Sequence, residues 1–519
     1  MLSRVNSLGL RGVEGFSVVV ELDLAGGLPA FTTVGLPDHA VKESRERVTA
    51  AVRNSGFKFP SRRITVNLAP ARPRKEGSHY DLPIALALLA ASGQAAGGEW
   101  EKGWCFVGEL SLDGRVRPVP GVLAMAERAR ADGFTTMVVP EENAAEASSA
   151  GLRALPVADL REAVGLLGGA AERPRAAGAV RAPSDVADSQ GLDLRDVRGQ
   201  TDAKRGLEIA AAGGHNLLLI GPPGTGKSML ARRLPGLLPP LDEAEAVEVT
   251  KVQSAIGRPP SGGLIRVRPF RSPHHACSAA ALVGGGPSAR PGEISLAHGG
   301  VLFLDELAEF PRPALEALRQ PLEERCVRVA RAKDSLEYPA RFLLVAATNP
   351  CPCGYLGHPK KSCTCTAHDV EKYLGRLSGP LLDRIDLQIE VGPVDFADWA
   401  SNAKAPGDSS ASSAHVRERV IAARGRQAKR WGEGPSAMNG LVESAALRRR
   451  ADATPEAFQA LEAAQRISAF SARALDRVLR VARTIADLAG SEQVGPPHII
   501  EAARFRGLDK LRAYLQEKR

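Results

Sequence analysis

A glycine-rich string that follows a short apolar run constrains the fold of this chain more than any other feature. Residues 221–228 read G-P-P-G-T-G-K-S, and the apolar residues 217–220 before them are typical of a buried strand. Glycines let backbone N–H groups close around a polyphosphate. The sequence therefore predicts a strand, a phosphate-binding loop and a helix, with a nucleotide held by Gly221, Pro222, Pro223, Gly224, Thr225, Gly226, Lys227 and Ser228.

A second string supplies the carboxylates that hydrolysis needs. Residues 301–306 read V-L-F-L-D-E, an apolar strand that ends in two acids. We expect Lys227 to reach the β- and γ-phosphates, and the Ser228 hydroxyl and Asp305 to hold Mg²⁺. Glu306 is placed to orient the attacking water. Both strings together arise by chance far less often than one, so they predict that the chain binds ATP and hydrolyses it.

Three more polar residues are candidates for the same reaction. Asn349 ends another apolar run and can orient the water, although its Asn-Pro pair also suits a turn. Arg384 lies at a predicted turn between a helix and a strand, where an arginine supplied by a neighbouring subunit could stabilise charge on the γ-phosphate. It could equally form a surface ion pair with Asp383 or Asp386. Arg473 begins an amphipathic helix from which it could contact the γ-phosphate.

Charge is unevenly distributed along the 519 residues, whose formal net charge is +9. Residues 1–165 hold 19 basic and 19 acidic side chains, whereas residues 411–519 hold 20 basic and 12 acidic ones. The positive excess could grip a polyanion or simply cover a helical surface. No apolar run reaches the ~18 residues of a membrane helix, and the N-terminus lacks the order of a secretory signal. We therefore expect a cytoplasmic protein without a membrane partner.

Four of the seven cysteines fall within residues 351–365, as two C-x-C pairs. These four are Cys351, Cys353, Cys363 and Cys365. In a reducing compartment such a cluster favours a metal over disulfides, and four thiolates suit tetrahedral Zn²⁺. The spacing is tighter than the usual C-x-x-C, so His358 or His368 could replace one ligand, and four free thiols are the alternative. The cluster predicts a structural zinc site that stiffens the segment after Asn349.

The chain divides into three predicted domains and two linkers. Residues 1–167 mix short strands and helices, residues 191–395 repeat strand–helix units as in an α/β fold with a parallel core, and residues 416–519 have helical periodicity. Residues 168–190 are rich in Gly, Ala, Pro and Arg, and residues 396–415 are polar. Both are interpreted as linkers.

The order of these elements resembles AAA+ ATPases of the helix-2-insert class, such as magnesium-chelatase motor subunits and MCM replicative helicases. Residues 268–306 resemble the insert and the strand after it, and residues 471–488 resemble the second sensor helix of these families. The resemblance implies a central AAA+ ATPase domain and a C-terminal helical lid of the magnesium-chelatase type.

Almost the whole chain, residues 1–515, is similar to one bacterial family, the ComM (YifB-type) magnesium-chelatase-like proteins. Members of that family are hexameric DNA helicases that drive branch migration during recombination of incoming DNA. The resemblance implies that this protein forms a ring, with six subunits expected. It also implies movement on single-stranded or branched DNA without regard to sequence, as in natural transformation.

A predicted β-hairpin between residues 324 and 342 supplies candidate DNA contacts. Val327 and Val329 alternate with polar residues before a tip that contains Arg331 and Lys333. A basic tip can touch phosphates without reading bases, which suits a sequence-neutral motor. In MCM-like helicases a hairpin at this position enters the central channel, so the resemblance points to Arg331 and Lys333. A solvated hairpin end is the alternative.

Residues 70–90 and 107–121 resemble the Lon protease domain, a ribosomal protein S5 domain 2-like α+β fold that uses a Ser–Lys pair for nucleophilic attack. The serine of that family falls on His79, with Ser78 one position early, and its lysine falls on Leu123. A leucine cannot act as a base. The resemblance therefore implies an inactive Lon-like domain over residues 1–167.

Three other functions compete with that of a DNA motor. A magnesium-chelatase motor subunit that remodels a protein partner would resemble residues 191–515, but it is not expected to carry the Lon-like domain or the cysteines. A Lon-like protease is disfavoured by His79 and Leu123. A protein unfoldase usually places an aromatic residue in a pore loop, and only 4 % of this chain is aromatic. DNA-stimulated ATPase activity would separate these functions.

Overall fold

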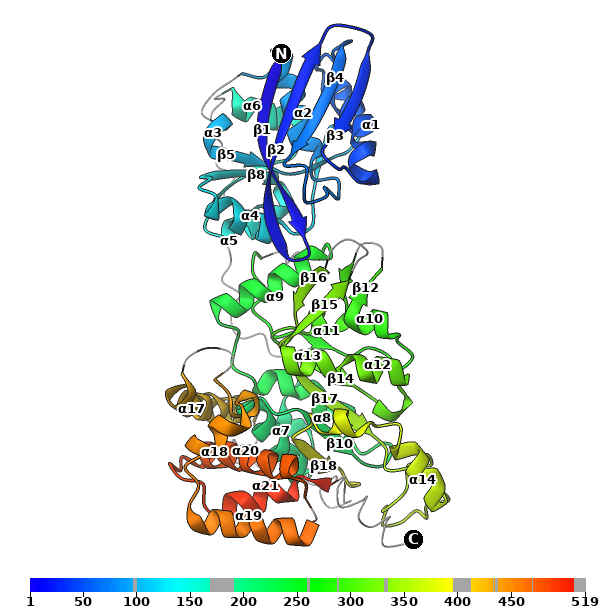
Figure 1. Cartoon of the computed structure of the whole chain (residues 1–519), viewed down its shortest axis with the longest axis vertical. Helices are drawn as coiled ribbons and strands as arrows, with labels where there is room; N and C mark the ends of the chain where they lie inside the picture. The colour runs from blue at the N-terminus through cyan, green and yellow to red at the C-terminus, as the bar shows by residue number, and fades with distance from the viewer. Residues whose placement is uncertain are drawn as a thin grey trace. The chain divides into compact units, whose positions relative to one another are not determined.

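The computed structural model describes most of the chain, and its contacts divide it into two compact units (Figure 1). The first unit comprises residues 1–184, 242–266 and 331–338, and the second comprises residues 185–241, 267–330 and 339–519. The described residues are 1–96, 100–168, 191–258, 262–286, 289–330, 335–394, 412–432, 434, 437–468 and 470–507. The two predicted linkers therefore lie outside the described residues, except for Gly168 and residues 412–415.

A seven-stranded mixed sheet forms the frame of the first unit. In sheet order, its strands are β3 (Ala30–Val34), β4 (Arg63–Ala69), β2 (Glu14–Ala25), β1 (Leu2–Arg11), β5 (Trp104–Phe106), β8 (Thr136–Pro140) and β9 (Arg153–Val157). β4, β2 and β1 pair antiparallel, whereas β1, β5, β8 and β9 pair parallel. Burial alternates along much of β2, as expected when one face of a sheet is covered more fully than the other.

The most buried helix of the first unit is α2 (Asp81–Ala91), which packs against β1, β2 and α1 (His39–Asn54). Because it is buried on every side, its sequence is apolar all round. It is one of the short helices expected among the strands of residues 1–167. Further elements are α3 (Trp100–Gly103), α4 (Val122–Ala131), α5 (Ala144–Ser149), α6 (Leu160–Leu167) and the antiparallel pair β6 (Glu109–Leu110) and β7 (Val116–Arg117).

α9 (Glu243–Ala255) belongs to the first unit although it follows the phosphate-binding loop in sequence. It packs against α4, where the Gly121 N–H donates to the carbonyl and hydroxyl oxygens of Ser254 at 3.1 and 2.9 Å. Lys251 forms an ion pair with Glu127 of α4 at 2.8 Å. A segment from the middle of the chain thus completes the first unit.

A five-stranded parallel sheet forms the core of the second unit, as the α/β prediction required. In sheet order, its strands are β11 (Phe270–Arg271), β14 (Val301–Leu304), β17 (Leu343–Thr348), β10 (Leu217–Ile220) and β18 (Leu387–Glu390). β10, β14 and β17 are buried along their whole length, which is typical of central strands in a parallel sheet. Since the strands run the same way, the residues that follow these three strands meet at one edge of the sheet.

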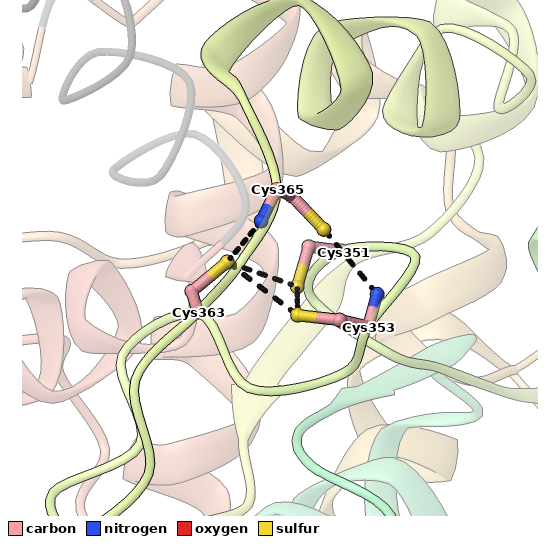
Figure 2. Close-up of side chains that lie close together, drawn as sticks. All are labelled: Cys351, Cys353, Cys363 and Cys365. Atoms are coloured by element: carbon pink, nitrogen blue, oxygen red, sulfur yellow. Dashed lines mark hydrogen bonds between the residues drawn. The ribbon is translucent and has the colours of Figure 1, made fainter.

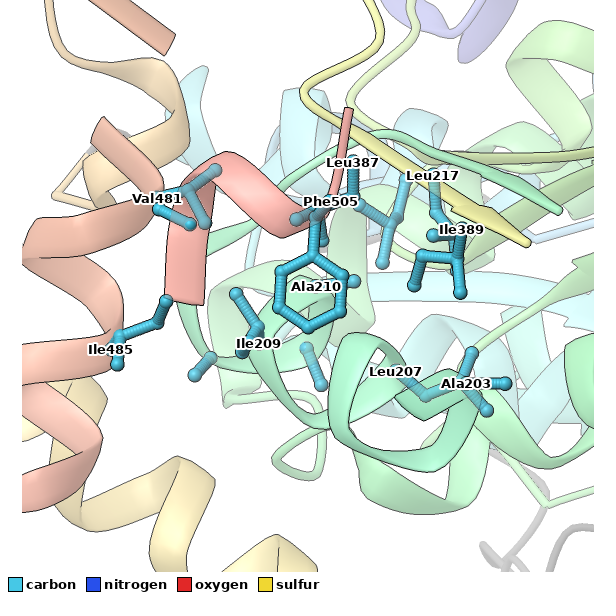
Figure 3. Close-up of a cluster of buried hydrophobic side chains, with 14 of the residues drawn as sticks. Ala203, Leu207, Ile209, Ala210, Leu217, Leu387, Ile389, Val481, Ile485 and Phe505 are labelled. Carbon is cyan, nitrogen blue, oxygen red and sulfur yellow. The ribbon is translucent and has the colours of Figure 1, made fainter. Parts of the chain in front are cut away.

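The C-terminal helices share one hydrophobic core with this sheet. Figure 3 shows part of that core, which includes Ile209, Leu217, Ile389, Ile485 and Phe505. α7 (Thr201–Gly213) approaches β18 so closely that a side chain at Gly206 would overlap Ile389. The helical prediction for residues 416–519 is confirmed over the described part. Other helices of this unit are α8 (Lys227–Arg233), α12 (Arg312–Ala317), α13 (Arg319–Glu324), α14 (Ala367–Leu374), α15 (Gly379–Leu382), α17 (Ser413–Trp431), α18 (Ser444–Arg450), α19 (Pro455–Ser468), α20 (Ala472–Ala489) and α21 (Pro496–Arg504).

Two inserted segments bear on the sequence predictions. α10 (Ala279–Val283) and α11 (Glu293–Leu296) flank the antiparallel pair β12 (Gly284–Gly285) and β13 (Arg290–Pro291), in the region that resembles a helix-2 insert. β15 (Cys326–Ala330) and β16 (Ser335–Pro339) form the two-stranded sheet expected for the hairpin. Its tip residues Arg331 and Lys333 lie outside the described residues. In the part of the chain that the structure describes, no helix combines the length and apolarity needed to cross a membrane.

Candidate nucleotide site and cysteine cluster

The phosphate-binding loop joins β10 to α8, and its lysine folds back onto it. Gly224 and Gly226 have positive φ angles of 78° and 88°, a conformation that other residues rarely adopt. The Nζ of Lys227 donates to the carbonyl oxygens of Gly221 at 2.6 Å and Pro222 at 2.8 Å. A lysine held by neutral carbonyls can exchange them for phosphate oxygens, which form stronger charge-assisted hydrogen bonds.

The same lysine connects the loop to a neighbouring strand. Its Nζ lies 3.2 Å from Oδ1 of Asn349, which directly follows β17. Burial lowers the pKa of Lys227, although the charges of Asp305 and Glu306 act in the opposite direction. The parallel sheet thus brings the lysine, the two acids and the asparagine to one edge.

Ser228 and Asp305 form a group of oxygen atoms that fits a magnesium ion. The Ser228 hydroxyl donates to Oδ2 of Asp305 at 2.6 Å. The other carboxylate oxygen, Oδ1, accepts the N–H of Glu306 at 3.0 Å, which fixes the orientation of the carboxylate. Mg²⁺ takes carboxylate, hydroxyl and phosphate oxygens as ligands. These side chains therefore suit the metal that the sequence predicts.

A histidine that sequence reasoning missed pairs with the second acid. Nδ1 of His275 lies 3.1 Å from Oε2 of Glu306. Glu306 has a φ of 53°, in the left-handed region that non-glycine residues seldom occupy. His275 follows β11, and β11 neighbours β14, so both residues leave the same edge of the sheet. The two adjacent histidines at 274 and 275 are visible in the sequence, but only the strand order shows that His275 lies beside Glu306.

Arg384 and Arg473 have other partners within a single chain. The Arg384 guanidinium forms an ion pair, but with Glu323 of α13 rather than with Asp383 or Asp386 as the sequence suggested. Arg473, whose side chain is 78 % exposed, lies 3.2 Å from Asp383. Among the described residues, the hydrogen bonds of both arginines go elsewhere than to the phosphate-binding loop.

A buried polar network lies between the turn that carries Arg384 and the helix that begins near Arg473. His215 places Nδ1 at 2.9 Å from Oδ2 of Asp386 and Nε2 at 2.7 Å from Oγ1 of Thr484 in α20. Burial disfavours the ionised form of Asp386, but the hydrogen bond with His215 and the charges of nearby arginines outweigh this effect, so its pKa is lowered. The network ties the start of β18 to α20, and sequence reasoning missed it because its members lie far apart along the chain.

The four cysteines of the C-x-C pairs face one another in Figure 2. Their Sγ atoms all lie within 4.8 Å of one another. The Sγ of Cys351 lies 3.4 Å from that of Cys353 and 3.7 Å from that of Cys363. Thiolates at ~2.3 Å from a tetrahedral zinc ion are about 3.8 Å apart. The cluster, which is completed by Cys365, therefore has nearly the dimensions of a zinc site.

Backbone N–H groups orient these sulfur atoms. The N–H of Cys353 donates to Sγ of Cys365, and the N–H of Leu356 donates to Sγ of Cys351, each at 3.4 Å. Hydrogen bonds from the backbone of Tyr355 and Thr364 lower the pKa of Cys353 to about 5. Because the thiolate is the form of cysteine that binds metals, this environment favours Cys353 as a ligand, whereas the pKa values of Cys351, Cys363 and Cys365 are raised.

The two histidines considered as replacement ligands are not part of this group. His358 accepts the backbone N–H groups of Lys360 and Lys361 through Nδ1, at 3.0 and 3.1 Å. Over the described residues, the set of possible metal ligands here contains the four cysteines and neither His358 nor His368.

Comparison with known proteins agrees with this architecture. Models described as "Magnesium chelatase, subunit ChlI", "Subunit ChlI of Mg-chelatase" and "Magnesium chelatase, subunit ChlI C-terminal" match residues 193–399, 20–143 and 410–506. The chain is 45 % identical to the uncharacterized protein YifB of Escherichia coli over 522 residues, with 99 % of both chains covered. It is 44 % identical to the competence protein ComM of Haemophilus influenzae over 513 residues, with 98 % of both covered. The chain belongs to the ComM/YifB-type magnesium-chelatase-like family.

Similarity to a chelatase subunit is more limited than similarity within the ComM/YifB-type family. The magnesium-chelatase 67 kDa subunit of Heliobacterium mobile is 28 % identical over 196 residues, which cover 32 % of this chain and 29 % of that protein. The ComM/YifB-type chain is thus a magnesium-chelatase-like AAA+ protein that matches this chelatase subunit over part of its length.

In this ComM/YifB-type chain, the surroundings of Ser78, His79 and Leu123, which the Lon-like resemblance singles out, can be described one by one. The Ser78 hydroxyl donates to the carboxylate of Glu109. Leu123 is fully buried in α4. Burial also lowers the pKa of His79 to about 4, so this side chain is neutral at physiological pH. The Lon-like relationship of this unit rests on its sequence and stays a prediction.

Proposed function

We propose that this protein is an ATP-dependent DNA motor that assembles into a ring of six subunits and drives branch migration during DNA recombination. ATP turnover is supported most directly by the 2.6 Å hydrogen bond between Ser228 and Asp305, which joins the phosphate-binding loop to the acidic strand end. The DNA role is supported by 44 % identity, over nearly the whole chain, to a protein named for competence.

The residues of the site divide the work of hydrolysis. Lys227 would leave the carbonyls of its loop and donate to the β- and γ-phosphate oxygens. Mg²⁺, when held by Ser228 and Asp305, neutralises charge that develops on the phosphates. Glu306 would orient a water molecule for in-line attack, and Asn349 would hold that water from the neighbouring strand.

In an assembled ring, Arg384 and Arg473 would act on the γ-phosphate of ATP. Within one chain Arg384 pairs with Glu323, and Arg473 pairs with Asp383. We propose that Arg384 instead reaches the γ-phosphate of a neighbouring subunit when a ring assembles, as arginines supplied in trans do. Arg473 would contact the γ-phosphate from the start of α20.

The hairpin tip is the proposed contact for DNA movement. Arg331 and Lys333 offer charge without base recognition, which suits a motor that ignores sequence. The positive excess of the C-terminal helices is a weaker candidate, because several of its arginines are engaged within their own unit. Arg448 pairs with Asp476 at 2.7 Å, for example.

The experiment that tests this function is ATP turnover with and without DNA. Wild-type turnover should rise when single-stranded or branched DNA is added, and Glu306→Gln should still bind ATP while turning over at least ~100-fold more slowly. The double variant Arg331→Ala/Lys333→Ala should keep basal turnover but lose DNA stimulation and the unwinding of forked DNA. The matched control Arg449→Ala/Arg450→Ala removes the same charge from α18 and should keep both. Normal stimulation of the hairpin variant would contradict the proposed contact.

A second function, remodelling of a protein partner, is favoured by the matches to chelatase subunits. A motor of that kind would turn over ATP at the same rate with any DNA structure and would respond only to its protein partner. A wild-type protein that neither binds DNA nor is stimulated by it would place this function first.

A further inference from the structure

The loop that carries the four cysteines also touches the phosphate-binding loop. Gly354 lies between the two C-x-C pairs and has a φ of +83°. A Cβ atom added there would lie 2.7 Å from Cδ and 3.0 Å from Cγ of Pro223, and 3.9 Å from Cγ of Asn349. Pro223 belongs to the phosphate-binding loop, and Asn349 contacts Lys227. The backbone of the cysteine loop is therefore packed directly behind the groups that would hold ATP.

No helix or strand within the cysteine loop holds Gly354 against Pro223. Residues 349–366, between β17 and α14, contain neither helix nor strand. The contacts that order them include a turn in which the Gly354 N–H donates to the Cys351 carbonyl at 3.0 Å, the backbone hydrogen bonds to Nδ1 of His358, and the convergence of the four sulfur atoms. A bound metal ion cross-links such a segment and lowers the entropy lost when it is ordered.

We propose that a zinc ion bound by Cys351, Cys353, Cys363 and Cys365 braces the phosphate-binding loop through Gly354, so that metal occupancy sets the affinity for nucleotide. This inference rests on the proposed binding of ATP at residues 221–228. It assigns the cysteine cluster a role in the nucleotide site in addition to stiffening the loop. Because tetrahedral sulfur ligation suits zinc or iron, metal analysis must identify the ion.

Two glycines of the cysteine loop provide a matched pair of variants. Gly354 and Gly357 both have positive φ angles, +83° and +77°, so alanine introduces similar backbone strain at either position. The Cβ at position 354 would collide with Pro223, whereas at position 357 it would have no atom within 4 Å. The difference between the two variants therefore reports the contact and not the strain.

The experiment measures metal content and the affinity for a fluorescent ADP analogue on the same purified full-length samples. Wild type should hold about one zinc ion per protomer. Gly354→Ala should keep its zinc and bind the analogue about tenfold more weakly, which is the scale of ~1.4 kcal/mol, while Gly357→Ala should match wild type in both. Cys363→Ser/Cys365→Ser should lose both zinc and affinity. Circular dichroism should show that these variants remain folded.

Lys227→Ala separates this inference from the proposed function, since it should lose nucleotide while keeping its zinc. If wild type binds zinc but no nucleotide, the proposed ATP site fails and the metal site stands. The inference is overturned if freshly purified protein contains no metal. It is also overturned if the serine variant loses zinc yet binds nucleotide like wild type, or if the two glycine variants bind it equally well.

Discussion

Each unit of the molecule contains a buried lysine, and the two lysines differ in what surrounds them. Lys75 of the first unit is fully buried, and Lys227 of the second is 9 % exposed. Burial lowers the pKa of both. The ammonium of Lys75 donates to the carbonyl of Pro70 five residues earlier, whereas that of Lys227 lies near two carboxylates and an asparagine from other strands. Burial alone therefore does not distinguish Lys227, the lysine proposed to bind phosphate, from Lys75; the convergence of separate strand ends does.

The largest expected effect comes from replacing each lysine by methionine. Lys227→Met should lower ATP turnover by at least ~10²-fold, because it removes a preorganised donor to the phosphates. Lys75→Met should leave turnover unchanged, because its ammonium only closes a local turn. Steady-state ATPase assays check both, with thermal unfolding as the control for folding. A similar loss in the two variants would remove the distinction between the lysines.

A second pair of variants compares two serines that each donate to a carboxylate. Ser228→Ala should lower turnover by about tenfold to a hundredfold, with partial recovery at high Mg²⁺, because it removes a group from the metal site. Ser78→Ala removes the contact with Glu109 and should leave ATP turnover unchanged. Neither wild type nor variant should cleave peptides. Peptide cleavage that disappears in Ser78→Ala would show that the first unit has protease chemistry.

The smallest expected effect is the net pH dependence of stability in the first unit, because two buried groups with opposite pKa shifts largely offset each other. His79 has a folded-state pKa of about 4, below its usual 6.5, so it favours the folded state above pH 6.5. This contribution, about 3 kcal/mol, is lost as the pH falls from 6.5 towards 4. Asp81 acts oppositely, since burial raises its pKa to about 6 and its contribution grows as the pH falls. Calorimetry at several pH values should show a shallower acid loss for His79→Gln than for wild type.

The parts of the fold that could be predicted are those encoded by neighbouring residues. Apolar runs before Gly221, Asp305 and Asn349 marked the central strands, because strands of a parallel sheet are buried on both faces. The cysteine cluster could also be predicted, because its four members lie within 15 residues of one another in the sequence. Partners from distant segments could not be predicted, and His275 and Glu323 are examples. Each lies opposite its partner only after the strands and helices have taken their order in space.

The contact between Gly354 and Pro223 belongs to the same unpredictable class. A glycine in a loop has many explanations, and only the folded chain shows that this one allows two loops to approach. The position of α9 in the first unit could not be predicted either, because nothing in the sequence of α9 indicates that it packs against α4.

The placement of α9 also limits how this protein can be taken apart. Because residues 242–266 complete the first unit, a fragment ending at residue 167 would lack Val247 and Leu264, which pack on its core, and the Ser254 acceptors of the Gly121 N–H. Conversely, the remainder of the chain would carry α9 with its packing face uncovered. Each unit is therefore built from separate stretches of the sequence. A single breakpoint in the gene cannot add, remove or exchange one unit intact, so we expect the two units to be inherited together.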